Sequence, residues 1–212
     1  MRYLFVFYPI LYTVLLIIGL LKYDKIRNSF YLRLFLIFIG YSLLTEIIGF
    51  ITGPVLGINN AIIYNTWNLV NPFFFMLFFL SRIVSIFVRR VLIGLIISYA
   101  IYSIIEISLF TNFINSFLDK NYIVGSFLIM ISTLIFFYEL LKSDKILNLK
   151  ESMFYWIGLG VLLFNVCFIP AHVISEYTSY GFAYRIITLV LNLIMAGCFI
   201  TGFIVSKKEF NI

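Results

Sequence analysis

The chain has 212 residues, of which 63% are hydrophobic, 20% aromatic and only 11% charged, and its mean hydropathy is +1.10. A soluble domain is typically about 45–50% apolar and about 25% charged, so this composition indicates an integral membrane protein. Seven spans of about 21 residues each would use most of the chain. Little sequence is then left between them for a soluble kinase, an ATPase or an extracellular binding domain.

Seven long apolar runs predict an all-α bundle of seven transmembrane helices. The first run has no small-residue cleavage pattern and is followed at once by Lys22, Lys25 and Arg27, so we interpret it as a span and not as a signal peptide. The whole chain, residues 1–212, is expected to form one transmembrane domain. The predicted spans are residues 3–22, 29–52, 61–82, 91–111, 121–142, 153–175 and 184–206.

The distribution of Lys and Arg predicts the orientation in the membrane. Alternate connections and the C-terminal tail hold twelve of the 15 cationic residues, whereas the other side keeps Arg2, Lys120 and Arg185. Positive charge is retained on the cytoplasmic side during insertion, so the N-terminus is expected outside and the C-terminus inside a bacterial cytoplasmic (inner) membrane. The net charge of +6 is then matched by anionic lipid headgroups. We expect no binding of nucleic acid, because there is no folded module with a basic stripe.

Ionisable groups are costly within a bilayer and usually face a bundle interior or a wet cavity. Two glutamates and the single histidine fall in the outer halves of their spans, near three asparagines spaced i, i+3, i+6 on one helix face. Arg33 and Glu139 lie near span ends, where they can extend to the interface. The predicted outer-half polar pocket consists of Glu46, Tyr64, Asn65, Asn68, Asn71, Glu106 and His172.

Two interpretations of this polar set stay open. In the first, the side chains only make interhelical hydrogen bonds that specify packing. In the second, they line an outward-facing pocket for a proton or a small polar or cationic ligand, with Glu46 and Glu106 as walls. His172 would then be the partner whose protonation changes between pH 5 and 8. Pro72 and Pro170 would each free a backbone carbonyl in the same region.

Smaller polar and glycine features have simple interpretations. Gly49 and Gly53 have the spacing of a close helix contact, but Pro54 and Gly57 favour helix termination and a turn. Tyrosines near span ends, Tyr99 among them, are expected to belong to the interfacial aromatic belt.

The chemistry of the chain argues against an enzyme and against a cofactor. Cys167 and Cys198 are expected to act as small, buried apolar residues, and with a single histidine they form no metal site. Lys207 and Lys208 lie beyond the last span, so no lysine could hold retinal there. No HExxH, GxSxG or phosphate-binding loop occurs, and no catalytic residue is assigned. An intramembrane acid–base pair of His172 with a glutamate is the remaining enzymatic alternative.

Five short strings stand out in the chain: Leu44–Gly49 (LTEIIG), Asn59–Asn60, Ile63–Asn65 (IYN), Phe137–Leu141 (FYELL) and Phe154–Gly158 (FYWIG). Together they resemble strings in an uncharacterised family of seven-span membrane proteins from Bacteroidetes-type bacteria. The size and topology also resemble the seven-span modules of bacterial signalling receptors. This resemblance implies a sensory role in which a separate protein carries the output.

The leading hypothesis is therefore a receptor-like or sensory membrane protein that passes the state of its outer pocket to a separate cytoplasmic or membrane partner. One alternative is a transporter of small solutes or a proton-coupled carrier. A polar path to the inner face through Thr133, Glu139, Asn165 and Asn192 would favour transport, and the last two could also link their two helices. A second alternative is a structural subunit of a membrane complex.

Overall fold

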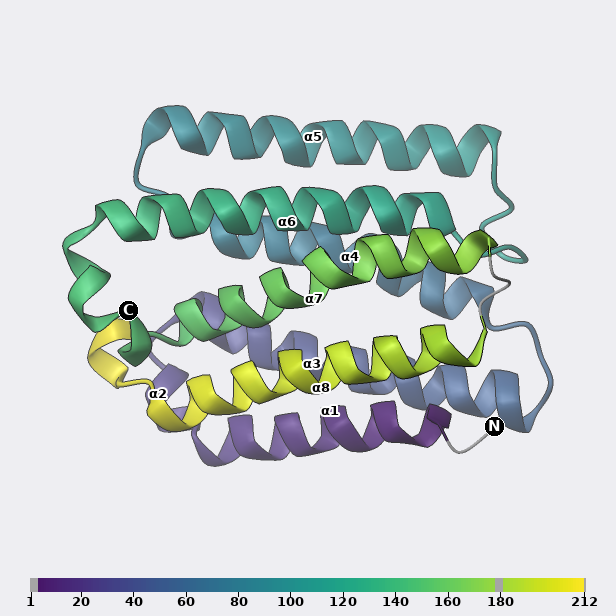
Figure 1. Cartoon of the computed structure of the whole chain (residues 1–212), viewed down its shortest axis with the longest axis horizontal. Helices are drawn as coiled ribbons and strands as arrows, with labels where there is room; N and C mark the ends of the chain where they lie inside the picture. Colours follow the sequence, from purple (N-terminus) through teal and green to yellow (C-terminus); the bar gives the residue numbers. More distant parts are fainter. Residues whose placement is uncertain (1–3, 178–180, 212) are drawn as a thin grey trace. The chain divides into compact units, whose positions relative to one another are not determined.

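The computed structural model describes residues 4–177 and 181–211, and over these residues the chain forms helices and no strands (Figure 1). Within these residues, eight α-helices are joined by short turns, one π-helical segment and one 3₁₀ segment, and a second 3₁₀ segment follows the last helix. The elements are α1 (Leu4–Leu21), α2 (Tyr23–Ile26), α3 (Phe30–Phe50), η1 (Ile51–Val55), α4 (Ala61–Leu80), α5 (Ile86–Leu109), α6 (Asp119–Lys142), η2 (Asp144–Glu151), α7 (Met153–Tyr177), α8 (Phe182–Val205) and η3 (Lys208–Asn211).

Six helices are long and apolar enough to cross a membrane. Within the described residues they are Phe30–Val55, Ala61–Leu80, Ile86–Leu109, Asp119–Lys142, Met153–Ser175 and Phe182–Val205. Each has 20 residues or more, and about 20 residues span the hydrocarbon core. The chain is therefore a multi-pass helical membrane protein whose lipid-facing side chains explain its many exposed large hydrophobic residues.

One predicted span matches its helix and another differs from it. The predicted first span, residues 3–22, corresponds to α1, whose 18 residues make it shorter than the six helices above. The span predicted to begin at residue 91 begins at Ile86, because Arg89 and Arg90 interrupt the apolar run without interrupting the helix. Arg2, used in the orientation argument, lies outside the described residues.

The chain divides into two compact units. Unit 1 comprises Met1–Leu43 and Leu140–Ile212, and unit 2 comprises Leu44–Glu139. The helix α3 contributes to both units, since the division falls between Leu43 and Leu44.

In unit 1 the last two helices, α7 and α8, lie side by side in opposite directions (Figure 1). Glycines allow this close approach: a Cβ on Gly160 would lie 3.0 Å from the Cβ of Cys198, and one on Gly202 would lie 2.7 Å from Sδ of Met153. Small residues at helix contacts are the usual way for membrane helices to pack, because lipid tails supply no hydrophobic driving force.

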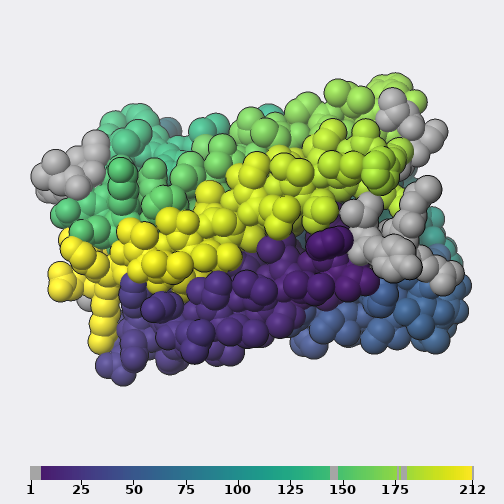
Figure 2. Space-filling model, turned by 60° about the horizontal axis from the view of Figure 1, so that its bottom comes forward, coloured from purple at the N-terminus to yellow at the C-terminus, as the bar shows by residue number. Residues whose placement is uncertain are grey.

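The helix α1 packs along α8, as the neighbouring purple and yellow surfaces of Figure 2 show. Near their first turns the hydroxyls of Tyr8 and Thr188 lie 3.3 Å apart. Near their last turns a Cβ on Gly19 would meet the ring of Phe203 at 3.0 Å. The two helices therefore run in the same direction.

Unit 1 ends in a polar layer that joins the C-terminal tail to three helices. The buried side chain of Asn211 accepts the Met153 N–H at 2.8 Å and donates to the Lys25 carbonyl at 3.1 Å. Lys25 Nζ in turn donates to the Ile204 carbonyl in the last turn of α8 at 2.5 Å, where helical carbonyls lack partners. Partial burial, and secondarily the neighbouring charge of Lys22, lowers the pKa of Lys25.

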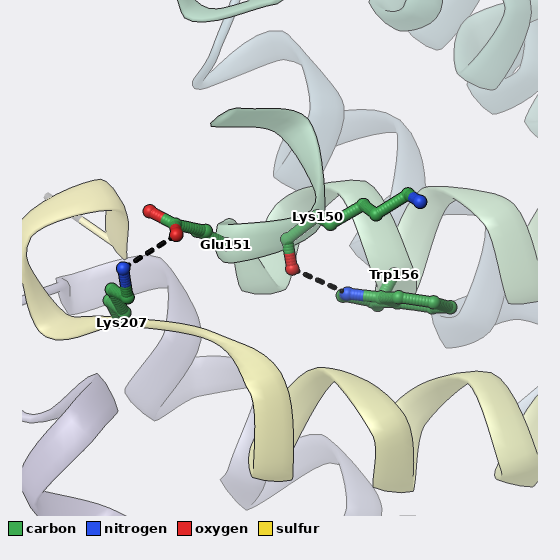
Figure 3. Close-up of polar contacts among 4 residues, drawn as sticks. All are labelled: Lys150, Glu151, Trp156 and Lys207. Carbon is green, nitrogen blue, oxygen red and sulfur yellow. Dashed lines mark hydrogen bonds and ion pairs between the residues drawn. The ribbon is translucent and has the colours of Figure 1, made fainter. Parts of the chain in front are cut away.

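Figure 3 shows two further contacts of this layer. Lys207 pairs with Glu151 at 2.6 Å, and the Trp156 indole donates to the Lys150 carbonyl at 2.9 Å. Hydrogen bonding to Glu151, followed by its charge, raises the pKa of Lys207. Both contacts are to η2, so they attach the start of α7 and the residues after α8 to the same 3₁₀ segment.

Unit 2 has an aromatic core between α4 and α6. Phe75, Phe78 and Phe79 are buried on α4, and Phe79 stacks on Phe136 of α6 with ring centroids 5.2 Å apart. The connections 51–60 and 110–118 lie at one end of this unit, where Asn59 Nδ2 donates to the Asn115 carbonyl at 2.9 Å. We call this the two-loop end.

Candidate functional site

A proline in α4 creates the first feature of the site. Pro72 has no N–H, so the carbonyl of Asn68, four residues earlier, lacks its helical partner. The hydroxyl of Tyr99 on α5 lies 3.2 Å from that oxygen. Pro72 also packs closely on α6, since a Cβ on Gly125 would lie 2.5 Å from Cγ of Pro72. The proline therefore exposes a carbonyl oxygen to a neighbouring helix, as the sequence predicted.

The same tyrosine begins a chain of hydrogen bonds between α5 and α6. Its hydroxyl lies 2.6 Å from Oδ1 of Asn121, and Nδ2 of Asn121 donates to Oγ of Ser103 at 2.9 Å. Ser103 is also hydrogen-bonded to Tyr99. All three side chains are buried, and those of Tyr99 and Asn121 are fully inaccessible. We call Tyr99, Ser103 and Asn121 the polar triad.

Glu106 lies one turn beyond the polar triad on α5. Its side chain is 4% exposed, and it is hydrogen-bonded to Tyr102 one turn earlier on its own helix. Within the described part of the chain, Oε2 of Glu106 has no hydrogen-bond partner. An unsatisfied buried oxygen is costly, and the cost is greater if the carboxylate is charged inside a membrane. A proton or a cationic donor would remove that cost.

Asn65 has a structural role. Its fully buried side chain donates to the carbonyls of Phe113 and Ser116 at 2.7 and 2.8 Å, and accepts the Leu118 N–H at 2.9 Å. These three bonds occupy both donors and one acceptor position of the amide. Asn65 therefore fixes the connection that leads into α6, and has no donor left for a ligand.

The second predicted glutamate belongs to a contact between α3 and α4. Glu46 is half-buried and hydrogen-bonded to Tyr64. The Tyr64 ring lies against Gly49, where a Cβ would be 2.5 Å from the tyrosine hydroxyl, and Asn60 donates to the Gly49 carbonyl at 3.0 Å. Gly53 likewise faces the Asn60 side chain at close range.

Gly49 and Gly53 therefore take part both in a close helix contact and in the termination of α3. The helix ends here through η1, and Gly57 has a φ of +69°, as a turn requires. The glycines also allow the close approach of α4 that the sequence had ranked second.

His172 lies in unit 1 and has its own surroundings there. Its Nδ1 is 2.7 Å from the hydroxyl of Tyr184 on α8, its ring stacks on Phe168 with centroids 5.1 Å apart, and it is 3% exposed. Its carbonyl accepts the Ser175 hydroxyl at 2.6 Å. The role of His172 as partner of the glutamates stays a prediction.

The structure places six of the seven predicted residues in unit 2 and the seventh, His172, in unit 1. They do not all face the same group: Asn65 holds a loop, Asn68 offers its carbonyl to Tyr99, and Asn71 is buried on the stretch of α4 that follows. The six are Glu46, Tyr64, Asn65, Asn68, Asn71 and Glu106.

The polar triad was missed by the sequence analysis. Tyr99 had been assigned to the interfacial belt, and this was wrong, since the side chain is fully buried. A signal was present, because Tyr99, Ser103 and Glu106 follow i, i+4, i+7 and so share one helix face. Asn121 was not singled out because it is the first residue of the predicted span 121–142.

Three of the four residues proposed for an inward polar path bond to their own helices. Thr133 donates to the Ile129 carbonyl, Asn165 to that of Val161 and Asn192 to that of Thr188. The hydrogen bonds that the two asparagines donate thus lie within α7 and within α8, and they do not link the two helices.

No group of three or more His, Cys, Asp or Glu side chains that could hold a metal occurs in the described part of the chain. Cys198 is half-buried, but Cys167 is exposed on α7, which corrects the expectation that both thiols are buried. In a membrane helix an exposed thiol of this kind faces lipid as a small apolar group.

Comparisons of the chain with family models, with curated proteins and with solved structures gave no match.

Proposed function

We propose that this protein is a receptor-like membrane protein in which Glu106 and the polar triad bind a proton or a small polar or cationic ligand from outside. The protein passes the state of this site to a separate partner through the loops that carry the excess of Lys and Arg. The observation that carries the proposal is the buried carboxyl of Glu106 with one unsatisfied oxygen. It adjoins three side chains that are fully hydrogen-bonded to one another.

The proposal includes a seventh crossing by α1, with the N-terminus outside. The 18 residues of α1 extend about 27 Å, close to the hydrocarbon thickness of about 30 Å. Because α1 runs parallel to α8, a crossing by α1 makes the number of spans odd. The excess of Lys and Arg on alternate connections of a seven-span chain then defines the cytoplasmic side of a bacterial inner membrane.

The hydrogen bonds support binding over transport. A carrier needs polar groups that continue from the outer cluster to the inner face. Three of the four residues proposed for such a path, Thr133, Asn165 and Asn192, instead donate hydrogen bonds to carbonyls of their own helices. These hydrogen bonds favour a binding site over a polar path through the membrane.

Thermal unfolding with and without candidate ligands tests the proposal. Purified wild type, Glu106→Gln and the matched control Glu139→Gln would be scanned with sodium, potassium, alkylammonium ions and polyamines. We expect a cation that stabilises wild type and Glu139→Gln by the same amount and fails to stabilise Glu106→Gln. Equal stabilisation of all three proteins would contradict a role for Glu106.

A second variant tests the other glutamate. An amide cannot exchange a proton as a carboxyl does, so Glu46→Gln should alter the dependence of thermal stability on pH between 5 and 8 if Glu46 belongs to the responding site. Identical pH profiles for wild type and Glu46→Gln would exclude Glu46 from the site that Glu106 and the polar triad form.

A further inference from the structure

A groove of about 360 Å³ lies between the start of α5 and the end of α6, away from the polar triad. It belongs entirely to unit 2, and its lining is apolar apart from one phenol. The lining residues are Phe87, Val88, Val91, Leu134, Ile135 and Tyr138. The two helices run in opposite directions here, so Phe87 and Tyr138 lie toward the end with Arg82, Arg89 and Arg90, while Val91 and Leu134 lie deeper.

The surroundings of this groove restrict what can fill it. A groove on the lipid-facing side of two membrane helices is bathed in acyl chains, and water has no polar partners there. The flanking cations add a second restriction. Arg89 and Arg90 are exposed, and neither takes part in an ion pair within the described residues. Basic positions at the ends of membrane helices attract anionic headgroups.

We propose that this groove is a binding site for an anionic phospholipid, with one acyl chain between α5 and α6 and the phosphate at Arg90. The choice between the two arginines follows from helix geometry. With 3.6 residues per turn, Arg90 lies about 105° from the centre of the face formed by Phe87, Val88 and Val91, whereas Arg89 lies about 155° away. Arg90 is also the i+3 neighbour of Phe87 on the helix surface.

The two arginines therefore form a matched pair for the test. Native mass spectrometry would compare retention of phosphatidylglycerol and of phosphatidylcholine with identical acyl chains by the full-length protein. Wild type should retain phosphatidylglycerol more strongly. Arg90→Gln should weaken this retention about fivefold, the effect of one cation near an anionic headgroup, while Arg89→Gln leaves it within about twofold.

A second pair of variants tests the acyl chain. Val91 and Ile93 are each 40% exposed, but only Val91 lines the groove. Val91→Trp should fill the groove and reduce retention of both lipids, and Ile93→Trp should not. Leu134→Trp, from the opposite wall, should reproduce the effect of Val91→Trp, so that the test does not depend on one variant that could disturb folding.

Three results would overturn the proposal. One is equal loss of phosphatidylglycerol in Arg90→Gln and Arg89→Gln, which would indicate nonspecific attraction to the basic ends of the helices. The second is unchanged lipid retention in Val91→Trp and Leu134→Trp. A dimer that Val91→Trp abolishes, and that forms without phosphatidylglycerol, would likewise overturn it by assigning the groove to a second copy of the chain.

Discussion

The hydroxyl of Tyr99 lies 2.6 Å from Oδ1 of Asn121, and this contact joins the middle of α5 to the first turn of α6. It leaves the amide nitrogen of Asn121 for Ser103 and sets the tyrosine hydroxyl within reach of the carbonyl that Pro72 frees on α4. Three helices thus share one small set of polar atoms. Glu106 extends this set toward the two-loop end with an oxygen that the described residues do not satisfy.

Tyr99→Phe should destabilise the protein, because it removes the hydroxyl that satisfies Oδ1 of Asn121. The expected loss in unfolding free energy is about 0.6–1.7 kcal/mol, from the average to the maximum measured for hydrogen bonds between membrane helices. Unfolding in mixed micelles would measure it, with Tyr177→Phe, at a side chain that is 86% exposed, as the control. Equal stability of the two variants would show that the contact contributes nothing.

Asn65→Ala should loosen the connection between α5 and α6. The substitution removes three hydrogen bonds at a buried side chain, and each buried group left unsatisfied costs about 1–3 kcal/mol. Amide exchange at Leu118 should therefore become faster. The control is Asn59→Ala, at an exposed residue that bonds to Asn115 in the same connection. Leu118 exchange that is unchanged in Asn65→Ala would contradict this role.

Gly49→Ala and Gly40→Ala should have opposite effects although both lie on α3. A Cβ on Gly49 would meet the Tyr64 ring, which must then move away from Glu46, and such overpacking typically costs about 1–3 kcal/mol. A Cβ on Gly40 meets nothing within 4 Å, so alanine there should stabilise the helix by up to about 1 kcal/mol. Unfolding free energies of the two variants provide the comparison. If neither variant loses stability, the close contact of Tyr64 with Gly49 is not maintained in solution.

The ion pair of Lys207 with Glu151 should make stability depend on alkaline pH. Glu151 raises the pKa of Lys207 above its ordinary value of 10.5 in the folded protein. The stabilisation is therefore fully present below pH 10.5 and is lost as the pH rises through the folded pKa. Wild type should lose stability over this interval relative to Lys207→Gln, with Lys208→Gln behaving as wild type. Parallel alkaline profiles for wild type and Lys207→Gln would exclude the linkage.

The long helices could be predicted from the sequence because an apolar run of about 20 residues has few alternatives in a bilayer. The prediction was less accurate where charges lie inside a helix, as Arg89 and Arg90 do. Hydropathy measures the length of an apolar run, and it does not register that a helix continues through two exposed arginines.

The candidate site could be predicted only in part, for a different reason. Depth along a span located Glu46, Asn68 and Glu106 at a common end, since the rise per residue is fixed. Depth could not show that the Asn65 amide would hydrogen-bond to the connection before α6, or that Tyr99 would be buried. Nor could it show that the tail would return through Asn211 to the start of α7, because such pairings depend on contacts between residues distant in the sequence.

Mass spectrometry of the protein gently extracted from its native membrane, scoring proteins and small molecules together, tests the central claim most directly. Wild type and Glu106→Gln would be compared. The account predicts that wild type retains a small polar or cationic molecule together with a signalling protein, and that Glu106→Gln loses the small molecule. A bound small molecule without any protein partner, retained equally by both proteins, would contradict the account and favour a transporter.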